Sequence, residues 1–68
     1  MKKSLEDAKK KAIEISKKHP NVACSVMDKK WEKAVVCCSG WVYKERILDG
    51  WKEIGRYVNG EEVKNNAE

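Results

Sequence analysis

The fold is decided by the stretch WEKAVVCCSG WVYKERILDG WKEIGRYVNG, which covers residues 31–60 as three blocks of ten. Each block opens with Trp and closes with Gly, and the residue before that Gly is Ser, Asp or Asn in turn. Asp-Gly and Asn-Gly favour two-residue hairpin turns, because both positions need a positive φ, and Ser-Gly is compatible with such a turn. The eight residues between turns match a normal strand length. The stretch therefore predicts an antiparallel meander with strands near 31–38, 41–48 and 51–58.

Strands are also expected on both sides of this stretch. NVACSVM supplies a strand near 22–27, joined to the meander by the polar turn at 28–30, and a short last strand is expected near 61–64. An alternative comes from residues at helical spacing, which predict a second helix over 43–58 and an α-β-β-α protein: Tyr43, Ile47, Trp51, Ile54 and Val58. Gly50 and Gly55 would then cost about 1 kcal/mol each relative to Ala, so the meander is favoured.

The N-terminal segment SLEDAKKKAIEISKKHP has the pattern of an amphipathic helix. Leu5, Ala8, Ala12 and Ile15 recur at three- and four-residue spacing and form one apolar stripe. Ser4 is placed to cap this helix, and Pro20 is placed to end it. The sequence thus predicts a single α+β domain over residues 1–64. In it, one N-terminal helix packs on an antiparallel β-meander of 4–5 strands, and a polar tail follows at 65–68.

Length, charge and cysteine content limit the class of protein. The chain has 68 residues, a formal net charge of +4 and three cysteines, which suits one small domain. An odd number of cysteines excludes a fully paired disulfide framework within one chain. Lysines interrupt the N-terminal stretch every few residues, so we expect no secretory or membrane-spanning segment. The expected protein is cytoplasmic, basic and has reduced cysteines.

Residues that carry chemistry are sparse. Cys37 and Cys38 are adjacent in a predicted strand, so their side chains point to opposite faces and are poorly placed to share a metal. The sequence has no C-x-x-C pair, no phosphate loop and one histidine, His19, beside Pro20. Glu45, Asp49 and Glu53 lie among basic residues, as expected for charge pairs between strands. We therefore expect no catalytic residue, no metal and no small-molecule cofactor, and the chain is not expected to be an enzyme.

The predicted sheet carries apolar residues on both faces. Two-residue turns place Val26 on the same face as Val35 and Cys37, and one helix covers only one of the two faces. An uncovered apolar face on a small protein marks an interaction site. We therefore expect a small non-catalytic interaction module that forms a homodimer or binds a protein partner through an open sheet face. The expected interface is Trp41, Tyr43, Ile47, Ile54 and Val58.

Nucleic-acid binding is the alternative function. Residues 1–33 carry ten lysines against five acidic residues, and exposed lysines attract a phosphate backbone. Only two of the fifteen basic residues are Arg, which is the better side chain for bidentate phosphate contacts. We therefore expect any such binding to be weak, through the lysines Lys3, Lys10, Lys17, Lys18, Lys29 and Lys30.

Overall fold

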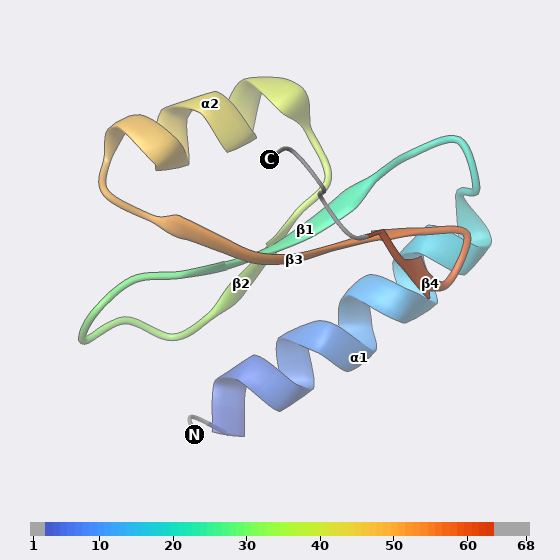
Figure 1. The fold of residues 1–68 in the computed structure, drawn as a ribbon, viewed down its shortest axis with the longest axis horizontal. Coiled ribbons are helices and arrows are strands. Elements are labelled where there is room, and N and C mark those ends of the chain that lie inside the picture. Colours follow the sequence, from blue (N-terminus) through green and yellow to red (C-terminus); the bar gives the residue numbers. More distant parts are fainter. Residues whose placement is uncertain (1–2, 64–68) are drawn as a thin grey trace.

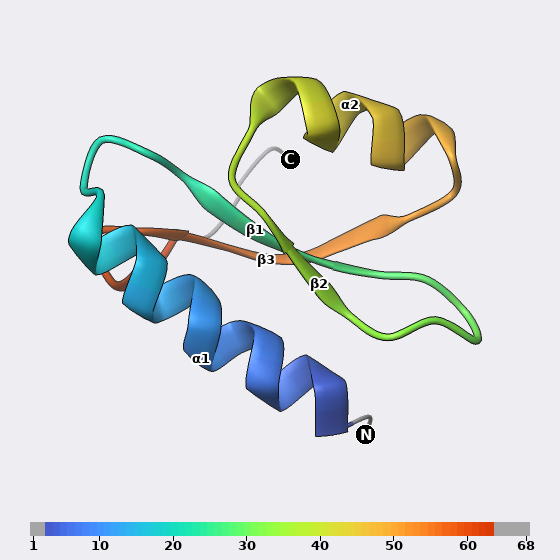
Figure 2. The same ribbon diagram turned by 180° about the vertical axis from the view of Figure 1, so that it is seen from behind.

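The computed structural model describes residues 3–63 as two helices and four strands. The elements follow the order α1 (Lys3–Lys18), β1 (Cys24–Asp28), β2 (Val35–Cys37), α2 (Gly40–Leu48), β3 (Lys52–Val58) and β4 (Glu61–Glu62). The predicted tail at 65–68 lies outside the described residues. Figure 1 shows α1 and α2 on opposite sides of the sheet, and the view from behind in Figure 2 agrees.

The sheet is antiparallel and has the order β2-β1-β3-β4. The prediction of an α+β fold with an N-terminal helix on an antiparallel sheet is confirmed. The order differs from a meander because β1 lies between β2 and β3. The chain therefore leaves β2 at one side of the sheet, passes through α2 and returns as β3 on the other side of β1 (Figure 1).

The predicted strand at 41–48 is wrong, since these residues belong to α2. The alternative helix over 43–58 is also wrong over its second half, because 52–58 is β3. The strand predicted at 31–38 shortens to Val35–Cys37, and residues 29–34 form a loop. In contrast, Asn59 and Gly60 both have positive φ, of 52° and 82°, and form the predicted hairpin turn between β3 and β4.

α1 buries the predicted apolar stripe. Ala8 and Ala12 are buried, and Leu5, Ile13 and Ile15 pack around the same cluster. The helix ends before Pro20, as expected. Ser4 does not cap the helix, because it lies inside α1 and its Oγ accepts a hydrogen bond of 3.2 Å from the Ala34 backbone N–H.

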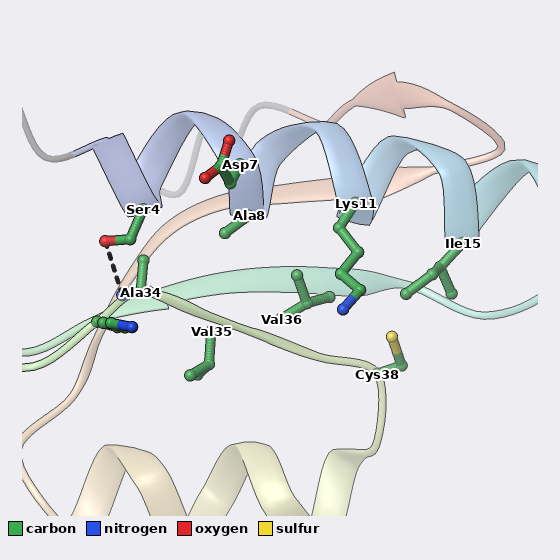
Figure 3. A pocket seen from close by; sticks show the side chains of 10 residues that line it. Ser4, Asp7, Ala8, Lys11, Ile15, Ala34, Val35, Val36 and Cys38 are labelled. Atoms are coloured by element: carbon green, nitrogen blue, oxygen red, sulfur yellow. Dashed lines mark hydrogen bonds between the residues drawn. The ribbon is translucent and has the colours of Figure 1, made fainter.

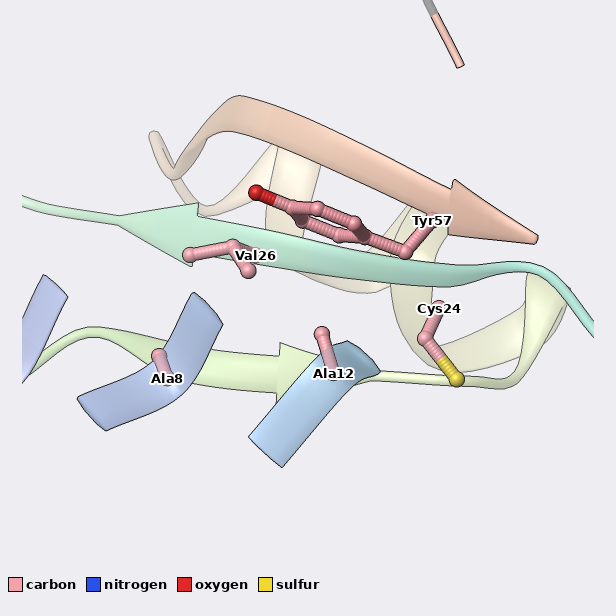
Figure 4. Packing of buried hydrophobic residues seen from close by; sticks show 5 residues of the cluster. All are labelled: Ala8, Ala12, Cys24, Val26 and Tyr57. Atoms are coloured by element: carbon pink, nitrogen blue, oxygen red, sulfur yellow. The ribbon is translucent and has the colours of Figure 1, made fainter. Parts of the chain in front are cut away.

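One core cluster lies between α1 and the sheet. Figure 4 shows Ala8 and Ala12 beneath Cys24 and Val26 of β1 and Tyr57 of β3. Small side chains on the helix let it approach the strands closely. This layer holds α1 firmly on one face of the sheet.

A second cluster lies between α2 and the other face of the sheet. Its buried members are Met27, Cys37 and Trp51, and Val35, Val42 and Tyr43 pack against it. Met27 is fully buried, and the burial of this side chain contributes roughly 1.5–3 kcal/mol to the free energy of unfolding. Val26 pairs with Val36, and Met27 pairs with Val35. The faces of β2 are thus shifted by one residue from the predicted register, and both faces of the sheet are covered by a helix.

Candidate functional site

α2 is defined by its ends. Ser39 has an extended conformation before the helix, and its carbonyl accepts the first helical hydrogen bond, 2.8 Å from the Tyr43 N–H. At the other end Gly50 has a φ of +93°. The Trp51 N–H donates to the Arg46 carbonyl at 2.9 Å, and the Gly50 N–H donates to the Ile47 carbonyl at 3.2 Å. These two bonds form a Schellman motif, which satisfies carbonyls that the helix leaves open.

The inner side of α2 contacts the sheet with few apolar atoms. Val42 and Tyr43 pack on the second core cluster, and the Arg46 guanidinium lies over the Trp51 ring at 4.9 Å. Arg46 Nε is buried without a hydrogen-bond partner, so the ring face is its main contact. None of the nine residues from Gly40 to Leu48 is itself buried.

The outer side of α2 carries the larger exposed side chains. Trp41 is 72% exposed and Leu48 is 88% exposed. They are seven positions apart, so they lie on one side of the helix, two turns from each other. Lys44 and Glu45 are exposed between them on the same side. We call these four residues, Trp41, Lys44, Glu45 and Leu48, the α2 surface.

A polar network supports α2 from β3. Glu53 Oε2 accepts hydrogen bonds from Ser25 Oγ at 2.6 Å and from Arg56 Nε at 2.9 Å. Glu53 Oε1 accepts from the Tyr43 hydroxyl at 3.4 Å. The bond to Glu53 is also the main reason that the pKa of Arg56 is raised. Because the Glu53 carboxylate is occupied by these donors, the network holds α2 in place and is poorly suited to acid–base chemistry.

The residues predicted to form the interface do not share one face. Trp41 lies on the α2 surface, Ile47 is 41% exposed beside it, and Tyr43 faces the sheet. Ile54 is 44% exposed at an irregularity of β3, where Val26 pairs with Gly55 and Met27 with Glu53. Val58 is half-buried near the end of β3. The predicted interface required an open sheet face, and α2 covers that face. The exposed apolar side chains of this region therefore lie on the helix.

The predicted lysine contacts are also separated. Lys3, Lys10, Lys17 and Lys18 lie along α1, whereas Lys29 and Lys30 lie in the loop after β1. Figures 1 and 2 show this loop and the C-terminal end of α1 at opposite ends of the molecule. Lys29 pairs with Asp49 at 3.2 Å, and the Lys17 side chain packs at the Gly60 turn. The six lysines thus form no single patch.

The cysteines point to both faces of the sheet, as predicted from their adjacency. Cys38 packs with the cluster beneath α1, and Cys37 belongs to the cluster beneath α2. Cys24 faces Cys38, with their Sγ atoms 2.8 Å apart. The prediction from the sequence did not include this pair. The only feature of the sequence that indicates it is the spacing of the two cysteines on either side of the expected turn. Within residues 3–63, no group of three or more His, Cys, Asp or Glu is arranged to hold a metal ion.

No protein-family model, curated protein or solved structure matches this chain. Neither described helix has the length and apolar content needed to cross a membrane.

Proposed function

We propose that this chain is a non-catalytic interaction module that forms a homodimer through the α2 surface. The observation that carries the proposal is the exposure of Trp41 and Leu48, at 72% and 88%, on a helix of nine residues. Exposed large apolar groups that are grouped together mark binding sites. The three free thiols support the cytoplasm as the proposed compartment.

The α2 surface is complementary to itself. The midpoint between Trp41 and Leu48 lies between Lys44 and Glu45. Two α2 helices packed antiparallel about a two-fold axis at this midpoint bring Trp41 of each copy against Leu48 of the other. The same axis brings Lys44 of each copy to Glu45 of the other. A two-fold interface requires this kind of self-complementarity, in which one patch serves both subunits.

The dimer is expected to be weak. α2 is only about 14 Å long, so a pair of these helices buries less than the roughly 1,200 Å² of a stable interface. We therefore expect a micromolar or weaker dissociation constant. Trp41 supplies most of the apolar contact, since an aromatic side chain buries about 150–250 Å². The exposed charge pairs contribute less than about 1 kcal/mol each, so they set the orientation more than the affinity.

The test is sedimentation equilibrium over a wide range of protein concentration, under reducing conditions and at low and high salt. The wild type should dimerise reversibly at both salt concentrations. Trp41→Ala should weaken the dimer at least tenfold, whereas Trp31→Asn should leave it unchanged. Trp31 is the matched control, because it is a Trp of 87% exposure that lies outside the α2 surface.

A charge exchange tests the antiparallel orientation. Lys44→Glu alone should weaken the dimer, because it places a second carboxylate beside Glu45 of the other copy. The double variant with Lys44→Glu and Glu45→Lys should restore it. A protein that stays monomeric at every concentration, or a Trp31→Asn variant that loses the dimer, would overturn the proposal. Salt-sensitive binding of DNA or RNA by such a monomer would favour the nucleic-acid alternative.

A further inference from the structure

Cys24 and Cys38 face one another across the β1–β2 ladder. Ser25 pairs with Cys37 in this antiparallel ladder, so the next position outward places Cys24 opposite Cys38. Cα atoms of directly opposed residues are about 4.5–5.5 Å apart, which falls within the roughly 4.4–6.8 Å that a disulfide spans. The two Sγ atoms are already in hydrogen-bond contact at 2.8 Å. Only a small movement of the side chains separates this pair from a covalent bond.

The two thiols differ in their access to solvent. Cys24 is fully buried, whereas Cys38 is half-buried. Cys38 lines a groove of about 490 Å³ between α1 and the edge strand β2, together with Lys11 and Ile15. Figure 3 shows the Lys11 side chain extending from α1 toward β2, on the same side as Cys38. A small molecule in the groove reaches Cys38 first. The charged residues that line the groove are Lys11, Lys33 and Asp7, and the two lysines outnumber the single carboxylate, which favours an anionic molecule.

We propose that Cys24 and Cys38 are a redox-active dithiol, which a small anionic disulfide such as glutathione disulfide converts to an intramolecular disulfide. The Cys38 thiolate attacks one sulfur of the small disulfide, forms a mixed disulfide and expels one thiolate. Cys24 gives up its proton to that thiolate, attacks Cys38 Sγ and expels the second small thiolate, which takes up the proton that Cys38 released when it ionised. The protein loses two protons and two electrons, and the small disulfide takes them up to become two thiols.

The environment of Cys24 limits the rate of the second step, in which Cys24 attacks the mixed disulfide on Cys38. Burial, followed by the hydrogen bond with Cys38, raises the pKa of the Cys24 thiol from 9.0 to about 12. A thiol must lose its proton before it attacks, so the mixed disulfide on Cys38 is expected to accumulate first at neutral pH. Its conversion to the internal disulfide should accelerate as the pH rises.

Cys37 is an internal control supplied by the chain. It is adjacent to Cys38 in sequence, yet it is 5% exposed, lies on the other face of the sheet and donates a hydrogen bond to the Ser39 carbonyl at 3.4 Å. Its neighbours in the second core cluster are Met27 and Trp51. An unselective oxidation of the thiols would also modify Cys37. Oxidation at the proposed site modifies only Cys24 and Cys38.

The experiment treats the reduced, full-length chain with glutathione disulfide, alkylates the remaining thiols and determines the products by intact mass and peptide mapping. Wild type and Cys37→Ser should both lose two hydrogens through a Cys24–Cys38 bond. Cys24→Ser should retain one glutathione on Cys38, and Cys38→Ser should react at least tenfold more slowly. Lys11→Gln should slow the reaction with glutathione disulfide but not with the neutral hydroxyethyl disulfide.

Peptide mapping of the wild type keeps the proposal falsifiable even where a variant folds poorly. A disulfide that includes Cys37, a product linked only between chains, or Cys38→Ser reacting as fast as the wild type would each overturn it.

Discussion

Gly40→Ala distinguishes the helix α2 from the hairpin that the sequence favours. Gly40 begins α2, its φ is not in the left-handed region, and an added Cβ meets no heavy atom within 4 Å. Alanine therefore fits without strain and restricts the unfolded chain. The expected gain in the free energy of unfolding is about 0.4–1 kcal/mol. In a Ser-Gly hairpin turn, the same residue would need a positive φ, and alanine would destabilise the protein.

The assay is urea unfolding followed by tryptophan fluorescence, with the buried Trp51 as a reporter and the protein dilute enough to be monomeric. A small domain has an m-value of about 1 kcal/mol/M in urea, so Gly40→Ala should raise the midpoint by roughly 0.4–1 M. The matched control is Gly50→Ala, where φ is +93° and the nearest atom to an added Cβ is Lys29 Cε at 3.9 Å. With no clash, its cost is the left-handed backbone alone, about 1–2 kcal/mol. A lowered midpoint for Gly40→Ala would refute the assignment of 40–48 as a helix.

Three further predictions concern the free energy of unfolding. Ser16→Ala should lower it by about 1–3 kcal/mol in urea titrations, because Ser16 is fully buried and its Oγ accepts the Gly60 N–H at 2.8 Å; an unchanged midpoint would contradict this role. Trp31→Asn should raise the melting temperature. Trp31 is 87% exposed and has a φ of 71°, and Asn tolerates this left-handed backbone region better than Trp does. A lower melting temperature would show that the Trp31 ring stabilises the loop. The pKa of Cys24, raised from 9.0 to about 12 by burial, makes the folded state bind its proton more tightly, so stability should be unaffected below pH 9. It should fall by up to about 1.4 kcal/mol per pH unit between pH 9 and 12, and Cys24→Ser should show a smaller decline in circular dichroism titrations.

The local signals at the two ends of α2 explain why it was predicted as a strand. Asp49 and Gly50 have the sequence of a hairpin turn, yet here they close a helix with a Schellman motif. Both structures need glycine at a positive φ, so the dipeptide does not discriminate between them. The choice is made by tertiary contacts, namely Arg46 over Trp51 and Tyr43 beside Glu53. At Asn59-Gly60 the tertiary contacts, from Ser16 and Lys17 of α1, are compatible with the hairpin turn, and the same type of signal predicted the correct turn.

The length of one loop explains the rest of the difference. Two-residue turns would place Val35 on the face of Val26, but the loop at 29–34 sets a register in which Val26 pairs with Val36 instead. A change of one residue in register exchanges the two faces of a strand. The α1 face could be predicted because its helical stripe is independent of this register. The Cys24–Cys38 pair and the position of α2 could not, because both depend on it.

The exposed apolar residues of α2 indicate a binding role, because they contribute little to the stability of the fold. α2 is attached to the sheet by its Schellman end, by Arg46 on Trp51, by the Glu53 network and by the half-buried Val42 and Tyr43, and none of its residues is fully buried. Its most exposed apolar side chains, Trp41 and Leu48, point away from the sheet, where lysine or glutamate would serve the helix equally well. An amphipathic helix normally turns its apolar side to the core. Trp41 and Leu48 gain burial only when a partner covers them, and the antiparallel arrangement of Lys44 and Glu45 favours a second copy of this chain as the partner that we propose.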